Sequence, residues 1–372
     1  MYGLVHAGLL WSKKFGGELK AKGFERSQAD PCAFRRRSQG KVVIIIVVYV
    51  NDLLLLSATK QDEQQALEDL RSSFPIKDLG EYSYYLGCHI TRDRKARTVT
   101  FDQRRYAQTV VERFDTKKTS TIPASPGVAP LSKGDGPQTD AEISEMRDTP
   151  YREAVGALMW IATMTWPDLS FVAHNVAKFD DNPGPAHWKA VQKALQYLKR
   201  TVDLGVTYGC ETSDVKLSAW VDADHATCPD TRCSVSGAAV MLGGGAINWF
   251  SRAQRVAAAA TSESEYVVLA EVVKELRFLR QVKAFMMPPM DQETRIYEDN
   301  EGEIKMANKW FSSRRTRHID IKNHIVRDAV EDKIARVEYV KSAEQHADVL
   351  TKALDVKTLE KYRQFLLNIC AS

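Results

Sequence analysis

Residues 216–254, KLSAWVDADHATCPDTRCSVSGAAVMLGGGAINWFSRAQ, decide the fold of this chain. They hold three short apolar runs, at 216–223, 236–244 and 246–254, which are separated by residues typical of turns. Strands of this length joined by short turns predict an antiparallel meander. A β-sheet therefore begins the C-terminal part of the sequence, from residue 216 onward.

The residues after the meander alternate between helical and strand patterns. Thr261 is placed to cap a long amphipathic helix over residues 263–285, and a strand at 294–299 follows a Met-Pro-Pro turn. A further strand over 335–342 precedes the last helix. The expected order is three strands, a helix, a strand, two helices, a strand and a helix, which predicts an α/β domain with a mixed five-stranded sheet.

Four acids stand at the ends of these predicted elements. Asp222 and Asp299 end strands, Glu265 lies at the start of the long helix, and Asp348 is expected to start the last helix. Each acid alone is most simply a helix cap or a surface charge, because carboxylates are common on surfaces. If they converge, however, their mutual repulsion requires a cation.

Clustered carboxylates suit hard cations such as Mg²⁺ or Mn²⁺. Two such ions about 3.5–4 Å apart can clamp both oxygens of an in-line phosphoryl displacement. The four acids therefore predict a two-metal nuclease centre.

Composition narrows the class of protein. The 372 residues suffice for two to three domains, and the net charge of +4 is compatible with a nucleic-acid partner without requiring one. The longest apolar run, residues 42–50, is too short for a membrane helix and predicts a strand buried on both faces. No signal peptide is recognised, so an intracellular protein, cytoplasmic or nuclear, is expected. Six scattered cysteines are expected to be free thiols rather than zinc ligands.

The chain before residue 215 divides into three blocks. Residues 1–115 alternate strand-like and helix-like segments, with Asn51 and Asp52 forming a hairpin turn between two apolar strands. Residues 116–149, rich in Pro, Gly, Ser and Thr, are expected to be a linker. Residues 150–210 carry helical patterns, and residues 215–372 form the domain with the four acids.

Several motifs in this domain resemble those of one family in order and spacing. They are the meander itself, TSESEYVVLAE at 261–271, EDNEGEIKMANK at 298–309 and QHADVLTKAL at 345–354. Their wording resembles the ribonuclease H domain of copia-type LTR retrotransposons. Residues 150–179 resemble the family's connection segment, and YVNDLLLLSA at 49–58 resembles its reverse transcriptase. The resemblance covers almost the whole chain and implies the C-terminal part of a Pol polyprotein.

The resemblance carries the family's metal ligands to Asp222, Glu265, Asp299 and Asp348. Three neighbouring acids compete for these positions in the local motifs: Asp224, Glu263 and Glu298. The family pattern favours Asp222 because it directly follows the strand, Glu265 because Tyr266 follows it, and Asp299 because Asn300 follows it. The implied cofactor is a pair of Mg²⁺ or Mn²⁺ ions, and the implied substrate is an RNA–DNA hybrid.

The reverse-transcriptase block departs from the family at its metal-binding turn. The family has Tyr-Val-Asp-Asp, whereas this chain has Tyr49, Val50, Asn51 and Asp52. An amide oxygen can touch a cation but brings no charge to hold it. Because the family's upstream palm segment has no counterpart here, residues 1–115 are expected to be a truncated palm and thumb remnant without polymerase activity.

A basic stretch near the acids is a candidate nucleic-acid-binding surface. Its members are Arg314, Arg315, Arg317, His318, Lys322, His324 and Arg327. The arginines and the lysine can neutralise phosphates, although a solvated helix face explains them equally well. His318 and His324 match the family pattern, and each is expected either to touch the substrate or to satisfy a local hydrogen bond. A proton-shuttling role for His346 is not favoured, because the segment lacks the longer His-bearing loop of cellular ribonucleases H.

The sequence thus predicts a ribonuclease H that cuts the RNA strand of hybrids by two-metal catalysis, fused to an inactive reverse-transcriptase remnant. Two other functions stay open. One is a catalytically silent fragment that only binds nucleic acid, and the other is a piece of a larger RNA-directed DNA polymerase completed by upstream parts of the polyprotein.

Overall fold

The computed structural model describes residues 6–209, 215–258, 260–287, 292–302, 304 and 320–369. The chain divides into two compact units, one of Met1–Glu81 with Glu275–Gln292 and one of Tyr82–Lys274 with Glu293–Ser372. This division follows contacts within the fold, and the domain boundaries expected from the sequence stay predictions. Among the described residues, no helix is both long and apolar enough to cross a membrane.

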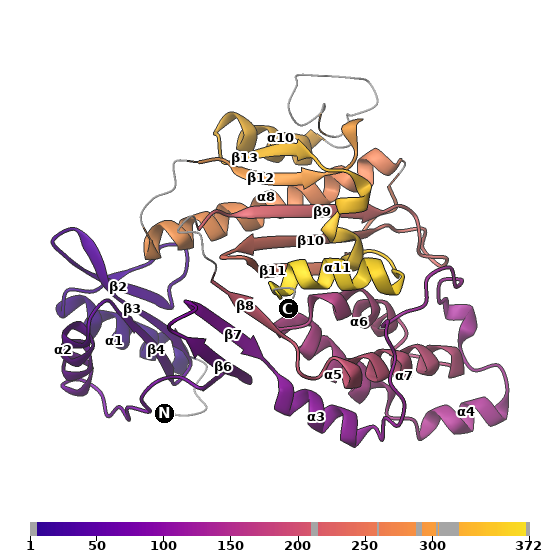
Figure 1. Ribbon diagram of the computed structural model, residues 1–372, viewed down its shortest axis with the longest axis horizontal. Coiled ribbons are helices and arrows are strands. Elements are labelled where there is room, and N and C mark those ends of the chain that lie inside the picture. The colour runs from indigo at the N-terminus through magenta and orange to yellow at the C-terminus, as the bar shows by residue number, and fades with distance from the viewer. Residues whose placement is uncertain are drawn as a thin grey trace. The chain divides into compact units, whose positions relative to one another are not determined.

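The first unit is built on a four-stranded antiparallel sheet in the order β1-β2-β3-β4. The strands are β1 (Glu25–Arg26), β2 (Ala33–Ser38), β3 (Lys41–Tyr49) and β4 (Asp52–Ser57), and the helices are α1 (Ala7–Ala21) and α2 (Lys60–Arg71). The Thr59 side chain caps α2 by accepting a hydrogen bond from the Asp62 amide. Figure 1 shows both helices beside the sheet.

Strand β3 corrects one expectation and confirms another. Ile44, Ile46 and Val48 are buried against Phe15 of α1, but the residues between them are only half-buried. The prediction of a strand buried on both faces is therefore wrong, because only alternate residues of β3 are buried. The predicted hairpin is confirmed, but its turn is one residue earlier than expected, since Tyr49 pairs with Asp52 across Val50 and Asn51.

The second unit begins with another antiparallel sheet and a group of helices. Its strands are β5 (Tyr84–Tyr85), β6 (Cys88–Asp93), β7 (Thr98–Asp102) and β8 (Gly205–Tyr208). Its helices are α3 (Arg104–Arg113), α4 (Asp140–Arg147), α5 (Tyr151–Met164), α6 (Ser170–Ala177) and α7 (Pro185–Arg200), with 3-10 turns η1 (Lys133–Asp135) and η2 (Pro167–Leu169). The helical patterns predicted for residues 150–210 are confirmed as far as Arg200, whereas Gly205–Tyr208 form β8.

The predicted linker is an ordered segment, which we call the strap (residues 116–149). It contains η1 and α4, and the Thr139 side chain caps α4 by accepting from the Glu142 amide. The buried ring of His187 on α7 donates from Nε2 to the Ser132 carbonyl over 3.0 Å. The role of these residues as a linker stays a prediction, and their composition signalled turns but not the tertiary contacts that fix them.

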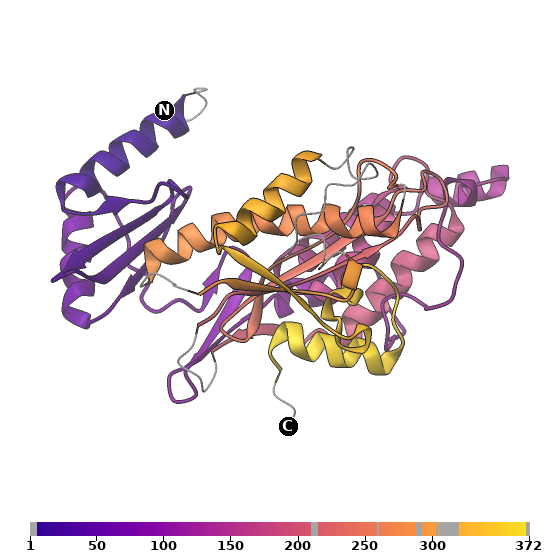
Figure 2. The same ribbon diagram turned by 90° about the horizontal axis from the view of Figure 1, so that it is seen from above.

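A mixed five-stranded sheet completes the second unit, in the order β11-β10-β9-β12-β13. The meander strands β9 (Ser218–Asp224), β10 (Val235–Leu242) and β11 (Gly245–Ala253) are antiparallel, whereas β12 (Thr294–Glu298) runs parallel to β9 and to β13 (Ala335–Tyr339). Helices α8 (Thr261–Met286) and α10 (Asp320–Glu331) lie on one side of the sheet, and α11 (Val356–Leu367) lies on the other (Figure 2). The predicted mixed sheet is confirmed.

Two expected helix starts need correction. Helix α8 already includes Thr261, and the amides of Glu263 and Ser264 donate to the Ala260 carbonyl, so Thr261 is not its cap. Asp348 does not start the last helix. It lies in the 3-10 turn η5 (His346–Leu350), which follows η4 (Ser342–Glu344), and α11 begins only after Asp355 caps it.

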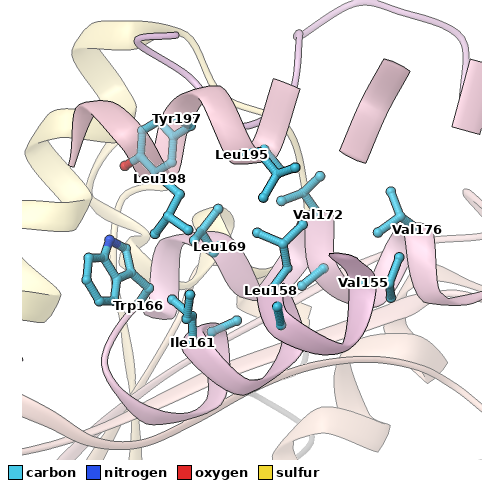
Figure 3. Close-up of a cluster of buried hydrophobic side chains, with 14 of the residues drawn as sticks. Val155, Leu158, Ile161, Trp166, Leu169, Val172, Val176, Leu195, Tyr197 and Leu198 are labelled. Carbon is cyan, nitrogen blue, oxygen red and sulfur yellow. The ribbon is translucent and has the colours of Figure 1, made fainter. Parts of the chain in front are cut away.

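The helices and the five-stranded sheet share one hydrophobic core. Figure 3 shows side chains of this core, including Leu158 on α5, Val172 on α6 and Leu195 on α7. The same core includes Ala239 of β10 and residues of η5 and α11. At its edge, the Trp249 indole donates to the Ala162 carbonyl over 2.7 Å. The helical segment therefore forms part of the support for the sheet that carries the acids.

Candidate metal centre

Two neighbouring parallel strands place two of the acids at the same end of the sheet. Strand β12 pairs with β9 so that Tyr297 lies beside Trp220. Side chains two residues further along each strand point to the same face. This register places Asp299, which directly follows β12, level with Asp222 near the end of β9.

A third acid reaches this point from α8. Oxygen atoms of Asp222, Glu265 and Asp299 all lie within 4.8 Å of one another. Asp222 and Glu265 are each only 4% exposed, whereas Asp299 is half-buried. We call these three residues the acidic centre. Three hard carboxylate oxygens, two of them buried, fit the donor preference of Mg²⁺ or Mn²⁺.

The protonation of Asp222 reflects its surroundings. Burial raises the pKa of the Asp222 carboxyl, and the nearby Asp299 raises it further. The ammonium of Lys352 and a hydrogen bond from the Thr351 hydroxyl oppose this increase. A buried cluster of like charges is thus partly relieved by the chain itself, and a bound cation would relieve it further.

Asp348 is outside the group of three and is held by a lysine. The Lys352 ammonium lies 3.0 Å from Asp348 Oδ1 and 3.6 Å from Asp222 Oδ2. Burial, followed by the charge of Asp222, raises the pKa of Asp348 to about 7. The sequence reasoning missed both Lys352 and Thr351. The available signal was the four-residue spacing from Asp348 to Lys352, which brings side chains together on one turn of chain.

The three competing acids lie differently. Glu298 precedes Asp299 on β12 and is fully buried, and its Oε1 accepts a hydrogen bond from the Asn300 amide over 3.0 Å. Asp224 shares a face of β9 with Asp222 but is one pleat further along, and burial raises its pKa. Glu263 lies in the first turn of α8. None of them belongs to the three-acid group found among the described residues.

A glycine on β10 and a glutamine after β11 position the elements that carry the acidic centre. Gly237 on β10 pairs with Asp222, and a Cβ at Gly237 would lie 2.5 Å from Thr351 Cγ2 and 2.8 Å from Leu350 Cβ. The glycine therefore lets η5 approach the sheet closely enough for Thr351 to reach Asp222. A second support comes from Gln254, which directly follows β11. Its Nε2 donates to the Ser264 carbonyl over 2.8 Å and fixes the start of α8 beside Glu265.

Comparisons with known proteins identify the family. A family model described as reverse transcriptase (RNA-dependent DNA polymerase) matches residues 1–126. The Pol polyprotein of transposon TNT 1-94 from Nicotiana tabacum is 33% identical over 98% of this chain and 27% of its own length. The Pol polyprotein of transposon RE2 from Arabidopsis thaliana is 30% identical over 95% of this chain and 24% of its own length. The chain belongs to the copia-type retrotransposon Pol polyproteins.

This chain spans about a quarter of the length of those Pol polyproteins. Among solved structures, a foamy viral protease-reverse transcriptase in complex with an RNA/DNA hybrid is 12% identical, with a TM-score of 0.46 over 92% of this chain and 39% of that one. The N-terminal ribonuclease H domain of a Mycobacterium tuberculosis protein is 16% identical, with a TM-score of 0.28 over 41% of this chain and 98% of that one. The family expected from the sequence is confirmed.

The residues expected to form the family's polymerase turn lie in the β3–β4 hairpin of the first unit. Val50 and Asn51 form the turn, Val50 has a φ of 54°, and Asp52 begins β4. Tyr49 and Val50 are 56% and 69% exposed, so the turn projects into solvent in this unit. Asn51 brings an amide and Asp52 a carboxylate to this turn.

The other residues expected to bind nucleic acid are placed only in part. Arg314, Arg315, Arg317 and His318 lie outside the described residues, and so does the side chain of Lys322. His324 is exposed on α10, and Arg327 on the same helix is half-buried. His346 stacks on Phe365 with ring centres 3.7 Å apart, and burial lowers the pKa of His346 to about 4.

Proposed function

We propose that this Pol chain hydrolyses the RNA strand of RNA–DNA hybrids at the acidic centre. The observation that carries the proposal is the convergence of Asp222, Glu265 and Asp299, with oxygen atoms within 4.8 Å of one another. Membership in the copia-type Pol family supports it, because a reverse-transcribing element produces such hybrids.

In this proposal, each acid has a separate task. Asp222 and Glu265 are buried and would hold the base of a cation site, while the half-buried Asp299 is the most accessible of the three and would lie nearest to an approaching phosphate. Asp348, across Lys352, completes the set of four carboxylates. Two bound Mg²⁺ or Mn²⁺ ions would activate water and stabilise the leaving oxygen. Preference for the RNA strand would come from its 2′-hydroxyl groups.

A cleavage assay on the full chain tests the proposal. We expect an end-labelled RNA strand in a hybrid to be cut with Mg²⁺ or Mn²⁺ but not with Ca²⁺, whose looser and longer coordination does not align a water molecule. Glu265→Gln should abolish cutting, because it removes a charged oxygen ligand. If the parent chain binds hybrid without cutting it in Mn²⁺, the alternative of a silent nucleic-acid-binding fragment replaces this proposal.

We also propose that residues 1–126 do not extend a primer in this chain. The support is Asn51, because polymerase chemistry uses carboxylates to hold its metal ions and the turn retains only Asp52. The assay is nucleotide incorporation on a primed RNA template. Incorporation that disappears with Asp52→Ala would contradict the proposal.

A further inference from the structure

The ammonium group of Lys352 lies between two carboxylates of the site. Its Nζ is 3.0 Å from Asp348 Oδ1 and 3.6 Å from Asp222 Oδ2, so it contacts one member of the acidic centre and the acid outside it. Asp224 is a third carboxylate whose charge acts on this ammonium. The lysine is thus at the position that a cation shared by Asp222 and Asp348 would take.

Two ion pairs hold this ammonium in place, because Asp348 and Asp222 both lie within 3.6 Å of its nitrogen. Lys352 is four residues after Asp348, and its ammonium donates a hydrogen bond to the Asp348 carboxylate. This bond holds the two side chains together. A fixed positive charge therefore already neutralises one side of the site.

We propose that Lys352 supplies the second positive charge of this site, so that the chain alone binds one divalent ion tightly at the acidic centre and a second ion only weakly. This inference rests on the proposed function, because it takes the acidic centre as an ion site. A second ion beside Asp348 must sit close to the ammonium or displace it, and like charges a few ångströms apart repel. Lys352 is then a positioning residue that holds Asp222 and Asp348 together, and the phosphate of a substrate favours entry of the second ion.

Titration of the full chain with Mn²⁺, followed by calorimetry and by electron paramagnetic resonance, tests this inference. We expect one ion to bind the parent tightly and a second at least about tenfold more weakly, as repulsion at this distance implies. In Lys352→Met, the second ion should bind at least about tenfold more tightly than in the parent. Lys352→Arg keeps the charge and should behave as the parent. Lys357→Met is the matched control, since Lys357 is an exposed lysine in the first turn of α11.

Thermal unfolding provides a second measurement. In a chelator, Lys352→Met should melt at a lower temperature than the parent, because Asp222 and Asp348 then repel without compensation, and Mn²⁺ should restore the loss. A lysine with only a packing role would show no such recovery. Equal affinity for two ions in the parent, or an unchanged second site in Lys352→Met, would overturn the inference while leaving the proposed function in place. If Lys352→Met does not fold, the titration of the parent alone still tests the inference, because it shows whether the two ions bind with different affinities.

Failure of the proposed function gives a different result. If the parent binds no Mn²⁺ at all, the acidic centre is not an ion site, and both the proposed function and the role of Lys352 are rejected. If Glu265→Gln removes the tight ion and Lys352→Met adds a second, both are supported.

Discussion

Glu298 and Asp299 are neighbours in sequence but have different environments. Successive side chains of a strand point to opposite faces. Glu298, the last residue of β12, is fully buried, while Asp299 joins Asp222 and Glu265. The local motif did not decide which of these two adjacent acids is the metal ligand. The alternation of side chains along the strand favours Asp299.

This difference gives a matched pair of substitutions. Asp299→Asn should reduce hybrid cleavage by at least about a hundredfold with little change in stability, because it removes a ligand charge from a half-exposed position. Glu298→Gln should retain cleavage but lower the free energy of unfolding, by about 1–3 kcal/mol if the change leaves a buried polar group poorly paired. Cleavage rates and urea unfolding of both variants check the assignment. The reverse pattern would move the ligand role to Glu298.

Gly237 is the second residue whose identity the site requires. Gly237→Ala should lower the free energy of unfolding by about 1–3 kcal/mol, because its Cβ would collide with Thr351 and Leu350. The shift of Thr351 should also remove its hydrogen bond to Asp222 and weaken Mn²⁺ binding. Urea unfolding and Mn²⁺ titration measure the two effects.

Gly156 provides the control for that substitution. It lies exposed on α5, and a Cβ there would meet nothing within 4 Å. Gly156→Ala should therefore raise stability by about 0.5–1 kcal/mol, as expected inside a helix. Equal effects at the two glycines would show that η5 does not depend on the space at Gly237.

Local chemistry explains which residues could be predicted from the sequence. The acids at 222, 265 and 299 stand at the ends of recognisable elements, so their motifs could be read directly. Lys352 could not be assigned a role, because its position depends on η5 folding back over β10. The same contact explains Gly237, whose only sequence signal is a glycine within a strand pattern.

At the scale of elements, local pairing was predictable and distant pairing was not. The β3–β4 hairpin and the β9–β11 meander join neighbouring segments, so turn residues and apolar runs reveal them. Strand β8, in contrast, pairs with β7 across the helical segment, with Phe101 beside Val206. No local pattern encodes a partner so far along the chain.

The contact between His187 and the strap predicts that the stability of the protein depends on pH. His187 Nδ1 accepts a hydrogen bond from the Gly184 amide over 2.9 Å, so protonation of Nδ1 would break this bond. Burial lowers the pKa of His187 below its ordinary value of 6.5, despite opposing contributions from the Ser132 carbonyl, Asp135 and Asp230. The unfolded chain then binds this proton more readily than the folded chain, and stability falls as the pH drops below about 6.5.

The variant His187→Gln isolates this contribution, because an amide can accept and donate as the neutral ring does but does not titrate. We expect the midpoint of urea unfolding to fall more steeply in the parent than in the variant between about pH 7.5 and pH 5. Parallel pH profiles for the two proteins would show that His187 does not link the strap to proton binding.

At the scale of the whole molecule, the shared core makes the helices and the C-terminal sheet depend on each other. Ala239 and Met241 of β10 and Ala246 of β11 belong to the same core as α5, α6 and α7. Tyr197 on α7 donates to the buried Asp168 and accepts from Arg363 of α11 over 2.9 Å. Removing the helices would expose apolar sheet residues and leave Arg363 without these partners.

We therefore expect the fragment 215–372 to be less stable than the fragment 82–372 by more than about 5 kcal/mol, an amount comparable with the whole stability of a small domain. Thermal unfolding by circular dichroism and size-exclusion chromatography compare the two fragments. A cooperative transition of 215–372 at the same temperature as 82–372 would show that the sheet does not need the helices. Tyr197→Phe in the longer fragment should show a smaller loss, because it removes hydrogen bonds and retains the ring.

The contacts of the strap also determine where proteases can cut. A segment rich in Pro, Gly, Ser and Thr is normally the first to be nicked. Here the amide of Lys133 donates to Asp230, and the carbonyl of Lys117 accepts from the Lys199 ammonium, so trypsin would have to detach bonded backbone before cleaving at these residues. Residues 126–130 are exposed throughout, yet contain no lysine or arginine. Elastase, which cuts beside small side chains such as Val128 and Ala129, should therefore open the strap within residues 126–130, where trypsin has no site.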